Sequence, residues 1–460
     1  MYETSSITEK IKLFVIIFVP IFVTQISLFL MNFFNTIMSG QAGAKDLAGV
    51  AIGTSLWVPI YTGMYGILLA VTPIIAQLTG AKKQKEITES MQQAIYVAIF
   101  LGIFVIILGA LLLDPVLQIM NLQQDVERIA KYYLFALSLG IIPYFIFNTL
   151  RNFMDALGRT RMSMAIILLT LPVNIVLNYI FIFGKFGLPK MGGIGAGLAT
   201  AMTYWINCII AVVCVYALTP FRSYHIFKNW KKPIFKQWKE QLTVGLPIGS
   251  ALFLETSIFS AVTILMSGYG TNTIAAHQAA MNFSSLLYMI PLSVGMALTI
   301  AVGYEVGANR LKDARTYTNI GISCSLLMAV FNSVILFVFK EPVASLYHTD
   351  TEVIELTSKF LILAIFYQLA DSFGAPIQGV LRGYKDVRIL FFIAIVSYWL
   401  IGLPIGWIFA NYTALEAFGY WIGITIGLTC GAIALLWRQF YIQKQYAFKS
   451  SQLYESRNVR

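Results

Sequence analysis

Long apolar stretches alternate with short polar segments along nearly the whole chain. About 20 apolar residues are enough for a helix to cross the hydrocarbon layer of a membrane. Twelve stretches reach that length, at roughly 12–37, 47–78, 92–113, 130–150, 162–183, 194–218, 242–268, 274–303, 316–339, 357–380, 388–410 and 417–441. The pattern therefore predicts an all-α integral membrane protein with twelve transmembrane helices. Because that number is even, both ends of the chain are expected on one side of the membrane.

The chain also repeats itself, and the two copies are offset by roughly half its length. AVTPIIAQLTGAKKQKE at 70–86 lies over ALTIAVGYEVGANRLKD at 297–313, and VPI at 19–21 over LPI at 246–248. Six helices per copy insert in the same orientation, which predicts two lobes related by a parallel repeat about an axis along the membrane normal. We place the boundary within the basic segment 219–240, here called the linker. The N-terminal lobe is then 1–225 and the C-terminal lobe 226–460.

The composition of the chain agrees with a membrane protein, and the distribution of its basic residues predicts its orientation in the membrane. Hydrophobic residues make up 58% of the chain, charged residues only 12%, and mean hydropathy is +0.75. Most of the 32 Lys and Arg residues fall on one set of connecting loops, so the positive-inside rule predicts an inner (cytoplasmic) membrane protein with both termini cytoplasmic. The net charge of +11 is spread over many loops beside anionic lipid, which argues against nucleic-acid binding. No soluble domain is expected.

Two carboxylates stand alone in apolar surroundings. Glu255 and Asp371 lie in the middle of long hydrophobic stretches that contain no Lys or Arg. An ionisable group near the bilayer centre costs at least ~2.5 kcal/mol, so this placement indicates ion handling. The other acidic residues can be assigned to loops, tails or helix ends. A pair of carboxylates neutralised by buried hydrogen bonds is the alternative.

Further polar residues share the depth of these carboxylates. Tyr288 lies about as far into its helix as Glu255 and Asp371 lie into theirs. Tyr367 and Gln378 follow helical spacing with Asp371, with Gln368 beside them. Oxygen ligands and a tyrosine ring face suit a dehydrated Na+, whereas a desolvated carboxylate suits a proton carrier. These residues by themselves leave Na+ and H+ both open.

Several segments together resemble the multidrug and toxic compound extrusion (MATE) transporters, and among them the NorM-like subfamily. They are FVPIFVTQISLFLMNFFNTIMSG, DLAGVAIGTSLWVPIYTGMYGILLAVTPIIAQLTG, RNFMDALGRTR, LPVNIVLNYIFIFG, GLPIGSALFLETSIFS and ADSFGAPIQGVLRGYKDVR, and the resemblance covers essentially all 460 residues. It implies export of lipophilic, often cationic drugs and dyes, driven by inward movement of Na+ or H+. It also implies a cation site at Glu255, Tyr288 and Asp371, with Tyr367 nearby. We expect a monomer with no cofactor other than the coupling ion.

The N-terminal lobe departs from the family pattern. Many members carry an aspartate in the first span, where this chain has Asn35, and some carry an acidic residue in the fifth span, where it has Asn174 and Asn178. We therefore predict no membrane-embedded carboxylate in this lobe and Na+ as the principal coupling ion. The three amides can coordinate an ion or a substrate hydroxyl but cannot carry a proton. Alternatively, they form interhelical hydrogen bonds worth ~0.6 kcal/mol each.

Other functions fit the sequence less well. A lipid-precursor flippase or another solute exporter of the same superfamily is the main alternative, but a flippase for pyrophosphate-linked lipids calls for a cationic cavity, and no Lys or Arg is predicted in mid-span. The chain lacks H-E-x-x-H, G-x-S-x-G and Walker motifs, so an enzyme or an ATP-driven pump is not expected. The four cysteines occur singly within apolar segments and are expected to pack in the core.

Overall fold

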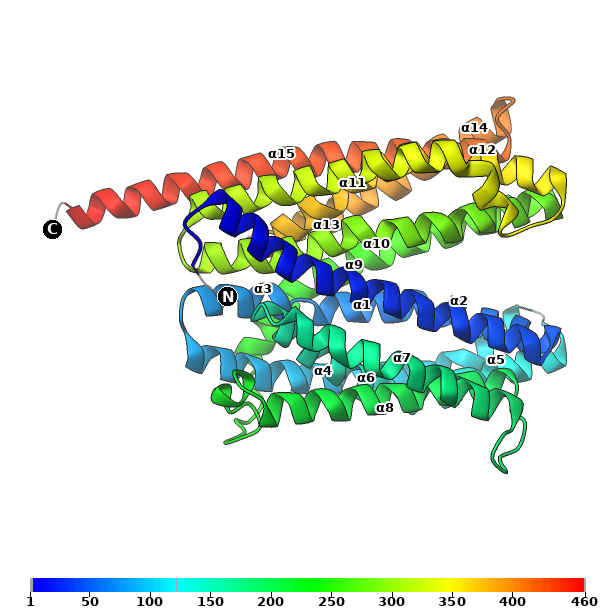
Figure 1. The fold of residues 1–460 in the computed structure, drawn as a ribbon, viewed down its shortest axis with the longest axis horizontal. Helices are drawn as coiled ribbons and strands as arrows, with labels where there is room; N and C mark the ends of the chain where they lie inside the picture. Colours follow the sequence, from blue (N-terminus) through cyan, green and yellow to red (C-terminus); the bar gives the residue numbers. More distant parts are fainter. Residues whose placement is uncertain (1–2, 121, 459–460) are drawn as a thin grey trace. The chain divides into compact units, whose positions relative to one another are not determined.

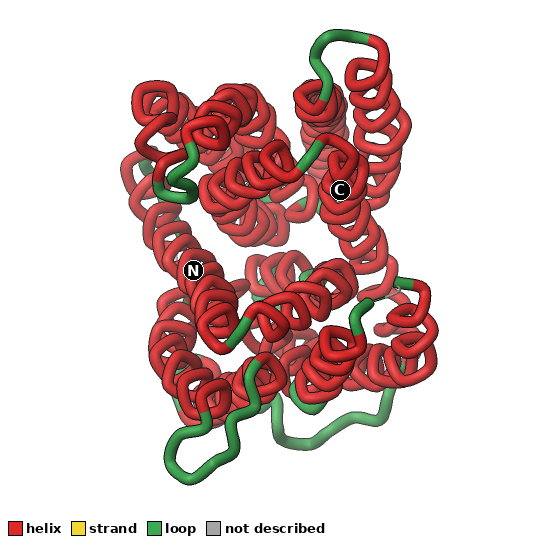
Figure 2. The backbone as a smooth tube through the Cα atoms, turned by 90° about the vertical axis from the view of Figure 1, so that its right-hand side faces the viewer, coloured by secondary structure: helices red, strands yellow, loops and turns green. Residues whose placement is uncertain are grey.

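The computed structural model describes residues 3–120 and 122–458, and within these residues it is helical without any strand (Figures 1 and 2). Eleven helices or helix pairs are long and apolar enough to cross a membrane, and two shorter helices bent by 51° complete a twelfth span. The predicted all-α fold with twelve spans is confirmed. Helices suit this setting because their backbone groups bond internally where no water is present.

The first repeat contains eight α-helices. They are α1 (Ile7–Ala42), α2 (Ala44–Leu68), α3 (Val71–Gly80), α4 (Gln84–Ile119), α5 (Gln124–Ser138), α6 (Ile141–Ala156), α7 (Thr160–Phe183) and α8 (Gly193–Ala217). Two spans are broken in this repeat. α2 and α3 are separated by a turn at residues 69–70, and α5 and α6 form the bent pair.

The second repeat follows a short 3-10 helix, η1 (Phe221–Tyr224), in the linker. Its elements are α9 (Phe235–Met266), η2 (Ser267–Tyr269), α10 (Thr271–Gly307), α11 (Leu311–Ser345), α12 (Thr351–Gly383), α13 (Arg388–Ala394), the π-helix η3 (Ile395–Gly402), α14 (Leu403–Tyr412) and α15 (Ala417–Asn458). In this repeat, α10 corresponds to the broken span α2–α3 and α12 to the bent pair α5–α6, and both α10 and α12 are continuous helices. The eleventh span departs from α-helix through η3, and α11 has a kink at Phe339.

The helices gather into two compact units. The C-terminal unit comprises Met1–Phe22, Thr79–Lys82 and Pro247–Arg460, and the N-terminal unit comprises Val23–Leu78 and Lys83–Leu246. α1 and α9 therefore each start in one unit and continue in the other. Each carries a proline at or near that point, Pro20 or Pro247, and these two prolines occupy equivalent positions in the sequence repeat. The lobe boundary between residues 225 and 226 stays a prediction.

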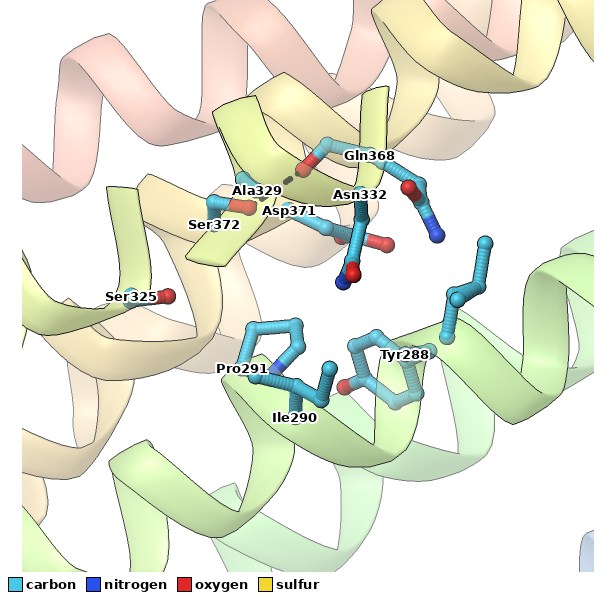
Figure 3. A pocket seen from close by; sticks show the side chains of 10 residues that line it. Tyr288, Ile290, Pro291, Ser325, Ala329, Asn332, Gln368, Asp371 and Ser372 are labelled. Carbon is cyan, nitrogen blue, oxygen red and sulfur yellow. Dashed lines mark hydrogen bonds between the residues drawn. The ribbon is translucent and has the colours of Figure 1, made fainter. Parts of the chain in front are cut away.

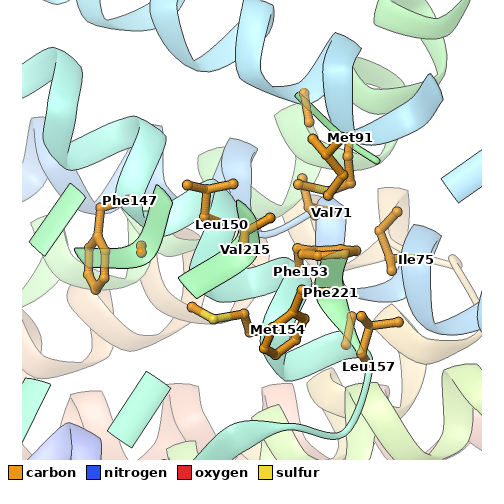
Figure 4. Close-up of a cluster of buried hydrophobic side chains, with 14 of the residues drawn as sticks. Val71, Ile75, Met91, Phe147, Leu150, Phe153, Met154, Leu157, Val215 and Phe221 are labelled. Carbon is orange, nitrogen blue, oxygen red and sulfur yellow. The ribbon is translucent and has the colours of Figure 1, made fainter. Parts of the chain in front are cut away.

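A dense apolar core holds the N-terminal unit together. Phe147, Phe153 and Met91 are fully buried within it (Figure 4). The linker contributes Phe221 and Ile226 to the same core. The linker is mainly non-helical, and these two side chains anchor it to the core.

Helices α6 and α12 extend further than the sequence pattern predicted. Residues 151–161 were assigned to a loop, but α6 continues to Ala156 and buries Arg151 and Asp155. Likewise, α12 continues to Gly383 and buries Arg382. Asp155 is the last residue but one of α6, so its burial in the protein does not place it within the membrane, and the absence of a membrane-embedded carboxylate from the N-terminal lobe stays a prediction. The sequence pattern assigned these charges to loops because each lies within two turns of a helix end, where apolar periodicity fades.

Candidate functional site

Close packing of α10 and α12 sets the geometry of the predicted ion site. A Cβ at Gly379 would lie only 2.0 Å from the Gly295 carbonyl oxygen, so both positions require glycine for the backbones to approach. The Thr299 hydroxyl of α10 donates to the Gly379 carbonyl of α12 at 3.0 Å and links the two helices at this crossing. Small residues at such crossings are typical of membrane helices.

A small cavity lies between α10, α11 and α12, and we call it the Asp371 cavity. Figure 3 shows Asp371 and Gln368 on one side of it and Tyr288 and Pro291 on the other. Measured as the space open to the centre of a water molecule, its volume is about 10 Å³. That is room for about one water or one small ion.

Several oxygen atoms around this cavity have no hydrogen-bond partner. They are Asp371 Oδ2, Gln368 Oε1 and Ser325 Oγ, each buried. Asp371 is only 4% exposed and Gln368 only 6%. An unpartnered buried polar atom costs about 1–3 kcal/mol. Three of them around one hollow indicate a site for a ligand that accepts oxygen coordination.

Glu255 is connected to the residues of the Asp371 cavity by a hydrogen bond from Tyr288. The Tyr288 hydroxyl donates to Glu255 Oε1 at 3.4 Å, and the Glu255 and Asp371 carboxylates interact electrostatically. Glu255 itself is half-buried and is not among the residues that line the cavity. The structure thus associates the three predicted cation-site residues, with Asp371 and Tyr288 at the cavity and Glu255 behind the tyrosine.

The predicted supporting residues divide into two sets. Gln368 lines the cavity, and Tyr367 interacts through its hydroxyl with the Asp371 carboxylate while its ring packs against Phe259 and Trp421. Gln378 lies two turns further along α12, where it interacts with Glu255 and accepts a hydrogen bond from Arg382 at 3.0 Å. α12 is buried on nearly all sides around Asp371.

His277 is held as a neutral side chain near the start of α10. The Trp421 indole donates to its Nδ1 at 3.0 Å, so that nitrogen must be an acceptor. Its Nε2 lies 3.1 Å from the Thr263 hydroxyl, which in turn donates to the Phe259 carbonyl. The ring therefore carries its hydrogen on Nε2. It connects α9, α10 and α15 as a structural group.

The three predicted asparagines of the N-terminal unit form one cluster. Asn178 donates to the side-chain oxygens of Asn35 and Asn174, which lie on α1 and on its own helix α7. Asn35 then donates to Thr200 and Asn174 to Thr203, both on α8. The cluster joins α1, α7 and α8. These bonds satisfy most of its amide groups, and Asn178 Oδ1 is the exception.

This cluster borders a larger hollow, which we call the aromatic hollow. Its volume, measured in the same way, is about 100 Å³. Its aromatic lining consists of Trp57, Tyr61, Tyr133, Tyr144, Phe147 and Tyr204. Asn35, Asn174 and Arg151 add polar groups to the wall. Arg151 Nε lies 3.7 Å from Asp155 Oδ2, and the Ser163 hydroxyl also donates to Asp155.

Sequence reasoning missed some of these contributors. Ser325 and Asn332 on α11 line the Asp371 cavity, but a single serine or asparagine in a span carries no distinctive sequence signal. Arg382 was assigned to a loop, although it interacts electrostatically with Glu255. Its i, i+4 spacing from Gln378 was the available clue. Among the described residues, no group of three or more His, Cys, Asp or Glu side chains is placed to hold a metal ion.

A family model confirms the repeat. The MatE model matches the chain twice, at residues 20–180 and 247–408. The two matches start at Pro20 and Pro247, which are the same two prolines that the sequence repeat places in register.

Similar proteins from bacteria match along their whole length. A "Probable multidrug resistance protein NorM" of Oceanobacillus iheyensis is 61% identical, over 97% of this chain and 100% of that protein. Proteins with the same description from Halalkalibacterium halodurans and Bacillus subtilis are 54% and 53% identical. They match over 97% and 98% of this chain and over 97% and 99% of their own lengths.

Solved structures share the fold at low sequence identity. A crystal structure of MATE in complex with MaL6 has a TM-score of 0.87 at 20% identity and covers 97% of this chain and 100% of its own. The eukaryotic MATE transporter AtDTX14 has a TM-score of 0.85 at 22% identity, covering 97% and 99%. From the family match and the close relatives, the chain belongs to the MATE family and is a multi-pass multidrug efflux transporter of the NorM type, not an enzyme.

Proposed function

We propose that this transporter exports lipophilic cations in exchange for Na+, which binds at the Asp371 cavity. The observation that carries the proposal is the group of buried, unpartnered oxygens of Asp371, Gln368 and Ser325 around a space for one small ion. Hard cations take oxygen ligands. The negative charges of Asp371 and Glu255 supply the attraction, and binding of the ion would remove the cost of the unpartnered oxygens.

The arrangement favours Na+ over H+ as the coupling ion. A proton carrier needs one carboxylate, and its single O–H when protonated is satisfied by one acceptor oxygen. A Na+ ion needs several such oxygens, and the cavity wall also includes Asn332, which has a carbonyl oxygen of its own. Proton coupling through Asp371 is the alternative that the transport assay below must distinguish.

The substrate class is inferred from the aromatic hollow. Tyr144 and Tyr204 lie with ring centroids 4.1 Å apart, and Tyr61 meets Tyr144 edge-on at 5.8 Å. Aromatic faces attract organic cations by about 0.5–1 kcal/mol at exposed sites and more where water is excluded. The hollow has ten times the volume of the Asp371 cavity, which suits a drug rather than an ion. We propose a monomer in the cytoplasmic membrane with both termini inside.

Separately imposed gradients test the coupling ion. Purified protein in proteoliposomes should drive ethidium transport when only a Na+ gradient is present at equal pH on both sides. A pH gradient without Na+ should drive little transport. Equal transport under the pH gradient alone would contradict Na+ coupling and leave multidrug efflux itself intact.

Exchange also requires that the two ligands oppose each other. By linkage, Na+ must raise the dissociation constant of a bound dye by the same factor by which the dye raises that of Na+. Coupling free energies of about 1–3 kcal/mol are typical, so the shift should be about 5- to 150-fold. The two titrations should be run at constant ionic strength and pH. An unchanged dye affinity in Na+-saturated buffer would contradict this exchange scheme.

A further inference from the structure

Side-chain amides of α4 hold the linker in one conformation. Gln92 is 1% exposed and donates to the carbonyls of Ile226 at 2.9 Å and Lys228 at 3.0 Å. Its oxygen accepts from the Lys231 backbone at 3.3 Å. Together with the buried ring of Phe221 (Figure 4), these bonds make the first part of the linker a fixed surface.

That surface presents three basic side chains toward one hollow. The backbone makes successive four-residue turns, in which His225 N–H donates to the Arg222 carbonyl and Lys228 N–H donates to the His225 carbonyl. Arg222, His225 and Lys228 all line the same space with the end of α8 at Val215–Ala217. We call this space the linker hollow.

Among the residues that the structure describes, no acidic one lines the linker hollow. Within the described part of the chain, none of its three basic side chains forms an ion pair. By contrast, Lys231 on the same linker pairs with Glu89. The volume open to the centre of a water molecule is about 210 Å³, which exceeds that of the aromatic hollow. The space therefore has room and uncompensated positive charge for a polyatomic anion.

An apolar stripe on α8 leads to this hollow. Trp205, Ile209, Val213 and Tyr216 are 51%, 56%, 56% and 62% exposed and follow helical spacing along one face. Tyr216 ends the stripe and also lines the hollow. A ligand that matches both features has an anionic group attached to a long apolar tail.

We propose that the linker hollow binds the phosphodiester headgroup of an anionic membrane lipid, with an acyl chain along the α8 stripe. Basic pockets at the membrane surface are known to recognise lipid head groups in this way. Basic residues after a helix also balance the negative end of its dipole. That role needs neither a hollow nor an adjoining apolar stripe, and the lipid accounts for both. The proposal stands independently of the coupling ion and the drug.

Native mass spectrometry and short-chain lipid titration test this site. Detergent-purified protein is titrated with short-chain phosphatidylglycerol, phosphatidylcholine and inorganic phosphate. We expect phosphatidylglycerol to bind more tightly than either of the others. The double variant Arg222→Gln/Lys228→Gln should weaken phosphatidylglycerol binding about 30-fold, which is about 2 kcal/mol.

Two further variants serve as controls for this experiment. Lys236→Gln/Lys239→Gln removes the same charge from the same linker outside the hollow and should bind the lipid as the original protein does. Arg222→Lys keeps the charge and should retain affinity within a few-fold, even if the double variant is poorly folded. Equal weakening by the Lys236/Lys239 variant would overturn the proposal in favour of a diffuse charge effect. Equal binding of inorganic phosphate would overturn the lipid as the ligand.

Discussion

The hollows of the two units differ in size and chemistry although the units share a repeat. The C-terminal unit has a cavity of about 10 Å³ with a buried carboxylate and unpartnered oxygens. The N-terminal unit has a hollow of about 100 Å³ lined by aromatic rings and amides. The duplicated helices thus provide one framework twice, and side-chain substitutions in it separate a tight, charged site from a roomy, nearly neutral one.

One pair of repeat-related positions shows how this separation arises. Arg151 and Asp155 on α6 correspond in the sequence repeat to Gln378 and Arg382 on α12. In α6 the pair is an ion pair that balances its own charge. In α12 it is a hydrogen bond from Arg382 to Gln378, which leaves the positive charge to act on Glu255. The same i, i+4 geometry therefore has different electrostatic effects in the two units.

The largest expected effect follows from removing charge in the C-terminal unit. Asp371→Asn keeps the size of the side chain but removes the negative charge at the cavity. Losing one partner of a buried charge interaction costs about 2–5 kcal/mol, so Na+ affinity should fall at least about 30-fold. Na+-driven ethidium transport should fall below detection, with the protein still inserted.

Glu255→Gln should act in the same direction through loss of charge behind Tyr288. Equal expression and an unchanged elution profile in size-exclusion chromatography provide the control. Wild-type drug resistance in an Asp371→Asn strain would remove the Asp371 cavity as the coupling site. The difference between the hollows of the two units would then have to be explained by something other than ion coupling at Asp371.

A second prediction concerns stability in the N-terminal unit. Asp155→Asn leaves the buried Arg151 charge without its carboxylate, and breaking a buried ion pair in this way costs about 3 kcal/mol. The apparent melting temperature of the purified protein should fall by several degrees. The double variant Arg151→Gln/Asp155→Asn removes both charges and should recover more than half of the loss. If the double variant were as unstable as the single one, the ion pair would not be the source of stability.

The sequence predicted the framework well because it depends on strong and simple signals. Twelve apolar stretches and an internal repeat follow directly from the length and repetition of spans. The lone carboxylates Glu255 and Asp371 were equally visible, because a charge in an apolar run has a high cost. The association of Asn35, Asn174 and Asn178 could also be anticipated from their positions in the first and fifth spans.

Other features were out of reach for physical reasons. Helix ends are poorly marked where polar residues are buried by neighbouring helices, so Asp155 and Arg382 were read as loop residues. Hydroxyl and amide side chains such as Ser325 and Asn332 are common in spans, and only packing decides which of them face a cavity. The conformation of the linker depends on Gln92, which lies on α4 and far from the linker in sequence. The linker's own residues therefore do not indicate that conformation.

A third prediction distinguishes drug binding from ion binding. Tyr144→Ala removes a ring from the aromatic hollow and should weaken dye binding by about 0.5–1 kcal/mol, or about two- to fivefold. Na+ affinity should not change, because the described residues that line the Asp371 cavity all belong to the C-terminal unit. Tyr144→Phe keeps the ring and serves as the matched control. A Tyr144→Ala variant with weaker Na+ binding and normal dye binding would reverse the assignment of the two hollows.

The smallest expected effect on transport belongs to Asn35→Ala. This change removes the hydrogen bonds of Asn35 with Asn178 and Thr200. Hydrogen bonds between membrane helices contribute ~0.6 kcal/mol each on average, so the free energy of unfolding should fall by only about 1 kcal/mol. Because Asn35 carries no charge, Na+-driven ethidium transport should stay within about threefold of the original rate. The assay is run beside Asp371→Asn at equal expression, since the contrast between the two variants is the decisive quantity. Loss of transport as complete as in Asp371→Asn would mean that the asparagine cluster takes part in coupling. Both units would then bind the ion, instead of one binding the ion and the other the drug.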